Sequence, residues 1–368
     1  MTEVVTDARE ITAKWLERAL RRAGVLQQGR VAAVDVDARS ETWSSAASIR
    51  PRYSDDATGA PERLFLKMCP FAEFGPSEVD YYRRDYVGCA DAPLVRCYDA
   101  QYDAERLAYH VLLDDVSATH TNLWQAPVTP ALVDAIADGT AALHACRWRA
   151  AAIEAVGERL PGNAEIDRYF AHIARGLEPL LAVGGNDVRD EWRPLLREIF
   201  AQHPRLMRAR TREPRGICLV HGDINPGNLL APRPSVGAGL ASVGAGLPAI
   251  VYLIDRQPFD WSLRVWLGVS DLAYLMCSFW TEADRRAFER RMLERYHAGL
   301  VARGIADYSY DQMVADYRLA VVQSVYVAVE WCVLEKDREE KRWLWSRELR
   351  CAMSAFEELH CRALWAQP

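Results

Sequence analysis

The spacing of apolar and polar residues changes character along the chain. The first third alternates between apolar and polar positions over short runs, which is typical of half-buried strands. Residues 11–24 instead place Trp15, Leu16 and Leu20 on one helical face that ends at a glycine. Strands are expected at residues 31–37, 47–53, 64–68, 94–99 and 107–113, with a short helix at 77–86 that has Ser77 as its N-cap.

After residue 116 the pattern becomes mainly helical. A β-rich island at 217–254 interrupts the helices and contains a tandem repeat, SVGAGLA followed by SVGAGLP, which we interpret as a flexible hairpin insertion. Strands followed by helices indicate an α+β protein in two lobes, a β-rich N-lobe over 1–115 and a mainly helical C-lobe over 116–368. Helices are expected at 129–148, 164–181, 188–203, 281–303, 310–334 and 341–365.

Composition excludes several classes of function. The chain of 368 residues carries a net charge of −6 and has no basic block, which argues against nucleic acid or an anionic membrane as a partner. The N-terminus lacks an apolar signal segment, and the longest uncharged run, 235–254, is too rich in Gly and Pro to span a membrane. Nine cysteines without a C-x-x-C pair indicate buried free thiols in a reducing compartment. We therefore expect a cytoplasmic protein.

The strongest chemical signal is the loop His221-Gly222-Asp223-Ile224-Asn225-Pro226-Gly227-Asn228. An apolar strand enters this loop, and a second apolar strand ends at Asp255. Carboxylate and amide oxygens gathered at strand ends suit Mg²⁺. A further carboxylate beside such a metal can accept a hydroxyl proton. Phosphoryl transfer requires both functions.

The pattern H-G-D-x-x-P-x-N followed by an I-D strand resembles the aminoglycoside phosphotransferase family and its choline kinase-like relatives. These are small-molecule kinases with the protein-kinase-like fold. The resemblance extends to LFLKM, SEVDYY, HVLLDDV, ALHAC and the late G-x-x-D-L-A motif of Gly268 to Ala273. It therefore covers most of the chain.

The resemblance implies a role for each matching residue. Asp223 would be the catalytic base, and Asn228 and Asp255 would bind Mg²⁺. Lys67 would contact the α- and β-phosphates of ATP, and Glu78 would pair with that lysine. The nucleotide-binding set would further include Ser44, Ser45 and Asp114, and His221 and Asp271 would support the site structurally.

The spacing of the two aspartates agrees with this alignment. Asp223 and Asp255 are 32 positions apart, and removing the two seven-residue repeats leaves 18. That is close to the short gap between the catalytic loop and the metal-binding aspartate of kinases. The insertion would therefore lengthen a hairpin without moving either carboxylate.

Three positions depart from the family pattern. The loop over the phosphates falls at 40–45 and contains no glycine, although a Ser/Thr-rich turn can also cradle phosphates. The spacing from Lys67 to Glu78 is short, which leaves Glu73 as an alternative partner. Arg256 and Gln257 follow Asp255, as in the small-molecule kinases, where protein kinases have Phe-Gly.

Several residues also have a purely structural interpretation. His144 is expected in the core, Asp271 could be a helix N-cap, and the tryptophans at 331, 343, 345 and 365 suggest core packing. The acidic run at 330–340 is typical of a solvated face, but it would favour a cationic acceptor if it reached the site. Asp260 and Trp261, just after Asp255, are candidate substrate contacts.

The sequence thus predicts an ATP- and Mg²⁺-dependent O-phosphotransferase that acts on a small hydroxylated molecule, with an aminoglycoside or other antibiotic-like acceptor favoured. A metabolic kinase of choline or sugar type, a catalytically inactive pseudokinase that binds a ligand, and a protein kinase are the alternatives. Fold-level resemblance does not choose the acceptor, and the oligomeric state stays open.

Overall fold

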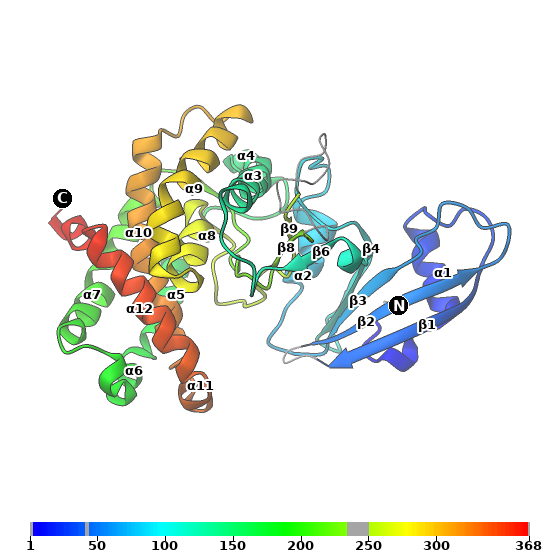
Figure 1. Ribbon diagram of the computed structural model, residues 1–368, viewed down its shortest axis with the longest axis horizontal. Helices are drawn as coiled ribbons and strands as arrows, with labels where there is room; N and C mark the ends of the chain where they lie inside the picture. Colours follow the sequence, from blue (N-terminus) through cyan, green and yellow to red (C-terminus); the bar gives the residue numbers. More distant parts are fainter. Residues whose placement is uncertain (1–2, 41–43, 234–249, 367–368) are drawn as a thin grey trace. The chain divides into compact units, whose positions relative to one another are not determined.

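The computed structural model describes residues 3–40, 44–233 and 250–366, in two compact units (Figure 1). The first unit comprises Met1–Thr121 and Tyr252–Asp260, and the second comprises Asn122–Val251 and Trp261–Pro368. The chain therefore returns to the first unit for the segment that contains Asp255. The SVGAGL repeats and the middle of the expected phosphate loop (Glu41, Thr42 and Trp43) lie outside the described residues.

An antiparallel sheet of five strands in the order β1-β2-β3-β5-β4 forms the centre of the first unit. Four of the expected strands are confirmed within a few residues. The fourth along the chain begins at Cys97 and not at Leu94. The bounds are β1 Val31–Ser40, β2 Ser45–Tyr53, β3 Leu64–Cys69, β4 Cys97–Asp103 and β5 Ala108–Asp114, with the short strands β6 His120–Asn122 and β9 Tyr252–Leu253.

One face of this sheet is covered by helix α1 (Ala13–Arg22), as the amphipathic pattern predicts. The Thr12 side chain caps the helix by accepting a hydrogen bond from the backbone N–H of Trp15. Trp15 and Leu20 pack with Leu66 of β3 in one buried cluster. Side chains alternate along a strand, so Lys67 points to the opposite face from Leu66.

The expected helix at 77–86 forms, but in two parts. Helix α2 (Ser77–Asp80) continues into the π-helical turn η2 (Tyr81–Asp85). Pro76 occupies the N-cap position, so the expectation for Ser77 was wrong. The Ser77 hydroxyl instead donates to the backbone carbonyl of Gln257, 2.7 Å away. The 3₁₀ turns of this unit are η1 Ala8–Glu10 and η3 Val116–Ala118.

The second unit is mainly helical, which confirms the α+β class (Figure 1). Helix α10 is almost entirely apolar on its buried faces and packs against α5, α7, α8, α9 and α12. The bounds are α3 Pro130–Cys146, α4 Ala150–Glu154, α5 Asn163–Ala174, α6 Leu177–Val183, η4 Gly185–Asp187, α7 Trp192–Arg210, β7 Ile217–Leu219, β8 Leu229–Pro232, β10 Val265–Leu267, α8 Val269–Tyr274, η6 Leu275–Phe279, α9 Glu282–Ala302, α10 Tyr310–Glu330, α11 Glu335–Glu340, α12 Arg342–Glu358 and η7 Cys361–Ala366.

The single helix expected at 164–181 is divided at Gly176. A Cβ atom at this position would lie 2.0 Å from the backbone oxygen of Val329 in α10. Glycine therefore allows the two backbones to approach, and the chain bends between α5 and α6. The tryptophans are only partly core: Trp345 is fully buried, whereas Trp343 is exposed.

Seven cysteines are free thiols, as expected: Cys69, Cys97, Cys218, Cys277, Cys332, Cys351 and Cys361. Cys89 and Cys146 are disulfide-bonded, so the expectation of free thiols throughout was wrong at these two positions. Among the described helices, none combines the length and the apolarity that crossing a bilayer requires.

Candidate active site

The loop between β7 and β8 holds the Asp223 carboxylate in a fixed orientation. Its Oδ1 accepts hydrogen bonds from the Asn225 side-chain amide at 2.8 Å and from the Tyr274 hydroxyl at 2.9 Å. Its Oδ2 accepts from the Asn228 amide at 2.9 Å. Gly222 has a φ of 78°, a conformation that glycine adopts without strain. Three hydrogen bonds fix the orientation of this carboxylate. A carboxylate positioned in this way can accept the proton of a substrate hydroxyl.

A buried aspartate from helix α8 supports this loop from behind. The Asp271 carboxylate accepts from the backbone N–H groups of His221 and Gly222 at 2.8 and 2.9 Å. Burial alone would raise its pKa, but the hydrogen bond and charge of His144 outweigh burial and lower it. Gly268 is the N-cap of α8, so the N-cap interpretation of Asp271 was wrong.

His144 and His221 support the loop around Asp223 through hydrogen bonds. His144 lies 3.1 Å from Asp271 through Nε2 and 2.8 Å from the Tyr296 hydroxyl through Nδ1. His221 is fully buried and accepts a hydrogen bond from the backbone N–H of Asp223 at 3.3 Å. Both side chains therefore order the loop around Asp223.

Gly268 is required by the packing behind this loop. A Cβ atom there would lie 2.7 Å from the Tyr296 hydroxyl, 2.9 Å from the Cys218 sulfur and 3.1 Å from Nδ1 of His144. We expect Gly268→Ala to lower the free energy of unfolding by about 1–3 kcal/mol, because the core there must shift. Urea unfolding measures this change. Gly75→Ala is the matched control, since a Cβ atom at Gly75 meets nothing within 4 Å, and an equal loss in both variants would contradict the argument.

In the first unit, Lys67 bridges two carboxylates. Its Nζ lies 2.8 Å from Glu78 Oε2 and forms a short ion pair with Asp255. Burial alone would lower the pKa of Lys67, but the two carboxylates raise it above its usual value. Burial raises the pKa of Glu78, whose carboxylate also accepts from the Tyr109 hydroxyl at 2.7 Å. Glu73 is exposed, and the partner of Lys67 is Glu78.

The backbone around Asp255 is unusual. Asp255 has a φ of 60°, in the left-handed region that only a few per cent of non-glycine residues adopt. The flanking residues are bound to α2 and η2: Leu253 accepts a hydrogen bond from the Tyr81 hydroxyl, and Gln257 accepts one from Ser77. These contacts hold the Asp255 side chain, which is 43% exposed, beside Lys67.

Arg256, for which the sequence indicated a family resemblance but no partner, has a structural function. Its guanidinium and the Asp85 carboxylate are both fully buried and form an ion pair. Arg84 also pairs with Asp85, at 2.8 Å. A buried arginine after an apolar strand is a signal in the sequence, because such a residue requires a buried acidic partner.

The remaining nucleotide-site candidates lie in or beside the sheet. Ser44 is buried, and Ser45 begins β2 opposite Met68 of β3. Asp114 ends β5, and its carboxylate accepts a hydrogen bond from the Tyr98 hydroxyl. The Asp114 side chain therefore already has a partner within the sheet.

The two candidate substrate contacts differ in their surroundings. Asp260 is exposed and ends the first unit. Trp261 stacks on His172 of α5, with ring centroids 4.2 Å apart and planes at 10°. One face of the indole is thus occupied by a side chain of its own unit.

Two glutamates of the second unit, the half-buried Glu330 and the buried Glu348, form an acidic group that the sequence only partly indicated. Glu330 ends α10, and burial raises its pKa to about 7. Glu348 of α12 is 1% exposed and accepts from Trp331 Nε1 at 3.1 Å. Burial raises the pKa of Glu348 to about 8. The negative charges of Asp223 and Glu330 also raise it, whereas the hydrogen bond from Trp331 and the charge of Arg347 lower it. Glu348 is therefore within electrostatic reach of the Asp223 carboxylate, and Glu330 is within reach of Glu348.

The residues that could hold a metal are few. Among the described residues, no group of three or more His, Cys, Asp or Glu side chains could hold a metal ion. The side-chain nitrogen of Asn228 donates a hydrogen bond to Asp223, so the side-chain oxygen is the atom of Asn228 that could bind a metal. An amide oxygen and the carboxylate of Asp255 are hard donors that fit Mg²⁺, an ion that takes its other ligands from phosphates and water.

Comparisons with known proteins identify the family and the fold. The model of the phosphotransferase enzyme family matches residues 52–239. No curated protein matches significantly. An ethanolamine kinase of Plasmodium vivax is similar in structure at 12% identity (TM-score 0.55), over 89% of this chain and 83% of that one. A choline kinase of Cryptosporidium parvum matches at 10% identity (TM-score 0.52), over 88% and 90% of the two chains.

A third structure is a glucosamine kinase in complex with glucosamine, ADP and inorganic phosphate. It matches at 14% identity with a TM-score of 0.53, over 94% of this chain and 86% of that one. These likenesses confirm the expected kinase-like fold. Since the family model spans more than half of the chain, the protein belongs to the phosphotransferase enzyme family and is a small-molecule kinase with a hydroxyl group as acceptor.

Proposed function

We propose that the protein transfers the γ-phosphate of ATP, with Mg²⁺, to a hydroxyl of a small cationic molecule of aminoglycoside type. The observation that carries this proposal is the Asp223 carboxylate, held by Asn225, Asn228 and Tyr274. Asp223 orients the acceptor hydroxyl and takes up its proton as the oxygen attacks the γ-phosphorus.

Within the first unit, Lys67 would bind the α- and β-phosphates. Its side chain is only 13% exposed, and the ion pair with Glu78 fixes the position of its Nζ. Asn228 and Asp255 would hold Mg²⁺, which supplies positive charge to the β- and γ-phosphates when bound. Asp255 would then exchange its contact with Lys67 for the metal.

The cationic part of the acceptor is inferred from Glu330 and Glu348. Burial raises the pKa values of these two carboxyls to about 7 and 8, and the charges of Arg175 near Glu330 and Arg347 near Glu348 offset it only in part. An ammonium group of the acceptor would supply further positive charge, ionise them and lower their pKa values. The acceptor would therefore bind more tightly as the pH rises from about 7 to 8.

The raised pKa of Glu348 also has a consequence for stability. The folded protein binds this proton more tightly than the unfolded chain, so the free energy of unfolding should fall as the pH rises from about 5 to 8, by about 1 kcal/mol per pH unit. Glu348→Gln mimics the protonated form and should reduce this slope in urea unfolding. The exposed Glu340 provides the control variant Glu340→Gln, and an unchanged slope in Glu348→Gln would contradict the assignment.

The function is tested by ADP release from Mg²⁺-ATP over a panel of aminoglycosides, macrolides, nucleoside antibiotics, choline and sugars, with Asp223→Ala as the blank. A hit with a cationic compound that disappears in the blank supports the proposal. A hit only with neutral sugars would reject the cationic acceptor. Nucleotide binding without transfer to any compound would favour a pseudokinase, and absence of nucleotide binding would reject the kinase function.

A further inference from the structure

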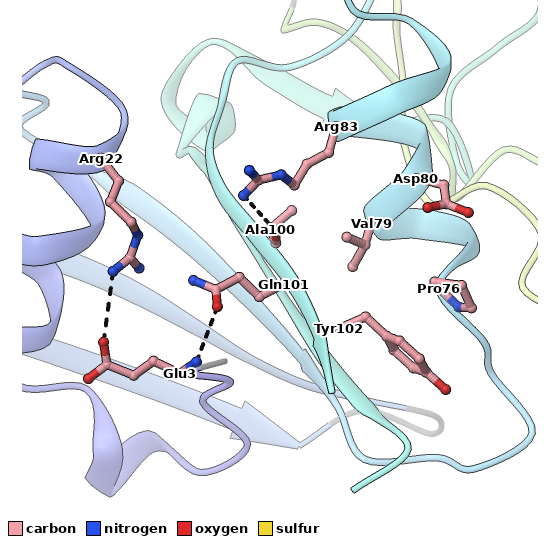
Figure 2. A pocket seen from close by; sticks show the side chains of 9 residues that line it. All are labelled: Glu3, Arg22, Pro76, Val79, Asp80, Arg83, Ala100, Gln101 and Tyr102. Carbon is pink, nitrogen blue, oxygen red and sulfur yellow. Dashed lines mark hydrogen bonds and ion pairs between the residues drawn. The ribbon is translucent and has the colours of Figure 1, made fainter. Parts of the chain in front are cut away.

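The first unit contains a pocket whose lining includes neither Lys67 nor Asp255. Its volume is about 540 Å³, within the usual range of small-molecule sites. Strand β4 forms one side, and the N-terminal segment, α1 and α2 with η2 form the others (Figure 2). The lining residues are Glu3, Arg22, Pro76, Val79, Asp80, Arg83, Ala100, Gln101 and Tyr102.

A buried carboxylate, Asp99, lies beneath the polar end of this pocket. Asp99 is 3% exposed, and it accepts hydrogen bonds from Arg22 at 2.7 Å and Gln101 at 2.9 Å. Arg83 forms an ion pair with it at 3.5 Å. Burial raises the pKa of Asp99, but hydrogen bonds from His110 and Arg22 outweigh burial and lower it to about 2. Asp99 is therefore an anion at neutral pH.

The charges around the pocket do not balance. Glu3 pairs with Arg18, and Asp80 pairs with Arg84. Arg22 and Arg83 remain, and they share the single Asp99 carboxylate. One positive charge is thus in excess at this end, even with Arg22 3.8 Å from Glu3.

Both guanidinium groups have unused donors. The side chains of Arg22 and Arg83 are 43% and 57% exposed. Arg83 uses only Nη1 in its contacts with Asp99 and the Ala100 carbonyl, as far as the described residues extend. Figure 2 shows Arg83 extending toward the space above Ala100 and Gln101, with Arg22 on the other side of it. A planar anion is the ligand that such forked donors recognise best.

The other end of the pocket has apolar side chains beside the Asp80 carboxylate, which pairs with Arg84 (Figure 2). Pro76 and Val79 of the α2 segment lie near the ring of Tyr102 (Figure 2). An apolar body placed there would cover these side chains while its acidic group reaches the two arginines.

We propose that this pocket binds a small organic anion, a carboxylate or a phosphate monoester attached to an apolar or aromatic body. Arg83 and Arg22 bind the anion, and Pro76, Val79 and Tyr102 contact the body. The site is separate from the one assigned to nucleotide and acceptor.

The position of the pocket links it to the nucleotide site. Val79 and Asp80 follow Glu78 directly in α2, and Arg83 lies in the π-helical turn after it. Such turns are rare and often occur at functional sites. A ligand that holds Arg83 therefore restrains the helix that positions Glu78 against Lys67. This consequence, unlike the binding itself, depends on the proposed function.

Binding is tested by titration calorimetry with phenyl phosphate and phenylacetate as probes, on the full chain. We expect Arg83→Gln to weaken the binding of both probes about tenfold or more, the loss of one charge-assisted contact. Arg52→Gln on β2 is the matched control, since Arg52 is 68% exposed and lies outside the pocket, and it should bind like the wild type. Benzyl alcohol, which has no anionic group, should not bind measurably.

Phenyl phosphate could also enter the nucleotide site, so Lys67→Met is titrated as well. Binding that persists in Lys67→Met and is lost in Arg83→Gln supports the pocket. Binding lost in Lys67→Met and kept in Arg83→Gln, or absent for both probes in the wild type, overturns the proposal. Because heat of binding needs no turnover, an inactive protein leaves this test intact. Thermal unfolding of each variant checks that it is folded.

The link to the nucleotide site is measured separately, as the dissociation constant of ADP with and without saturating phenylacetate. We expect a change of about threefold or more in the wild type and in Arg52→Gln, and none in Arg83→Gln. A pocket that binds the probe without changing ADP affinity would overturn the regulatory link.

Discussion

Asp223→Ala should lower kcat by about 10²- to 10⁴-fold, the usual contribution of a positioned base. The variant removes the carboxylate that Asn225, Asn228 and Tyr274 hold in place. The affinity for ATP should change little, because Lys67 and Glu78, which are assigned to the α- and β-phosphates, belong to the first unit. Steady-state ADP release and a nucleotide titration measure the two quantities.

The control for this variant is Asp311→Asn, which removes an exposed charge from the first turn of α10. It should keep the wild-type rate. A rate in Asp223→Ala above about a tenth of the wild type lies outside the range for a lost base, and Asp223 would then not be the base.

The largest effect on stability is expected from the buried ion pair of Asp85 and Arg256. Asp85→Asn keeps the shape of the side chain but leaves the Arg256 guanidinium fully buried without its carboxylate. We expect the free energy of unfolding to fall by about 3–5 kcal/mol. Nε and Nη2 of Arg256 already lack partners among the described residues, so no second acceptor relieves the charge. Equilibrium unfolding in urea measures the change.

A double-mutant cycle separates the ion pair from general disruption. Arg256→Met should cost less than Asp85→Asn, because Arg84 still pairs with Asp85 at 2.8 Å. The double variant should be more stable than Asp85→Asn alone, since it buries no unpaired charge. The exposed Asp91 provides the control Asp91→Asn. A double variant that loses the sum of both single effects would show that the two side chains do not interact.

The strands and long helices could be predicted because their patterns are local. The apolar run at 64–68 placed β3 correctly, and the amphipathic pattern placed α1. The break at Gly176 was not visible, because its cause is the backbone of α10, far away in the sequence. Ser77 was assigned as an N-cap for the same reason: its true partner is Gln257, 180 positions later.

At the site, too, local motifs could be predicted, whereas contacts between distant residues could not. The motif identified Asp223, Asn228 and Asp271, but the hydroxyl of Tyr274 that holds Asp223 comes from helix α8, where the residue reads as an ordinary core aromatic. Glu348 was missed because its helix carries other charged residues, and only packing shows that it is buried. Side chains that act through tertiary contacts leave little trace in a single sequence.

The return of Tyr252–Asp260 to the first unit has a consequence for synthesis on the ribosome. When Thr121 has been made, the sheet and α1 are complete, but Arg256 and Asp255 do not yet exist. Asp85 then lacks its ion pair with Arg256, and Lys67 lacks its ion pair with Asp255. The nascent N-terminal part therefore lacks the ion pairs of Arg256 and Asp255 until most of the second unit has been made, and a truncated chain ending at residue 121 should be less stable than one that also carries 252–260.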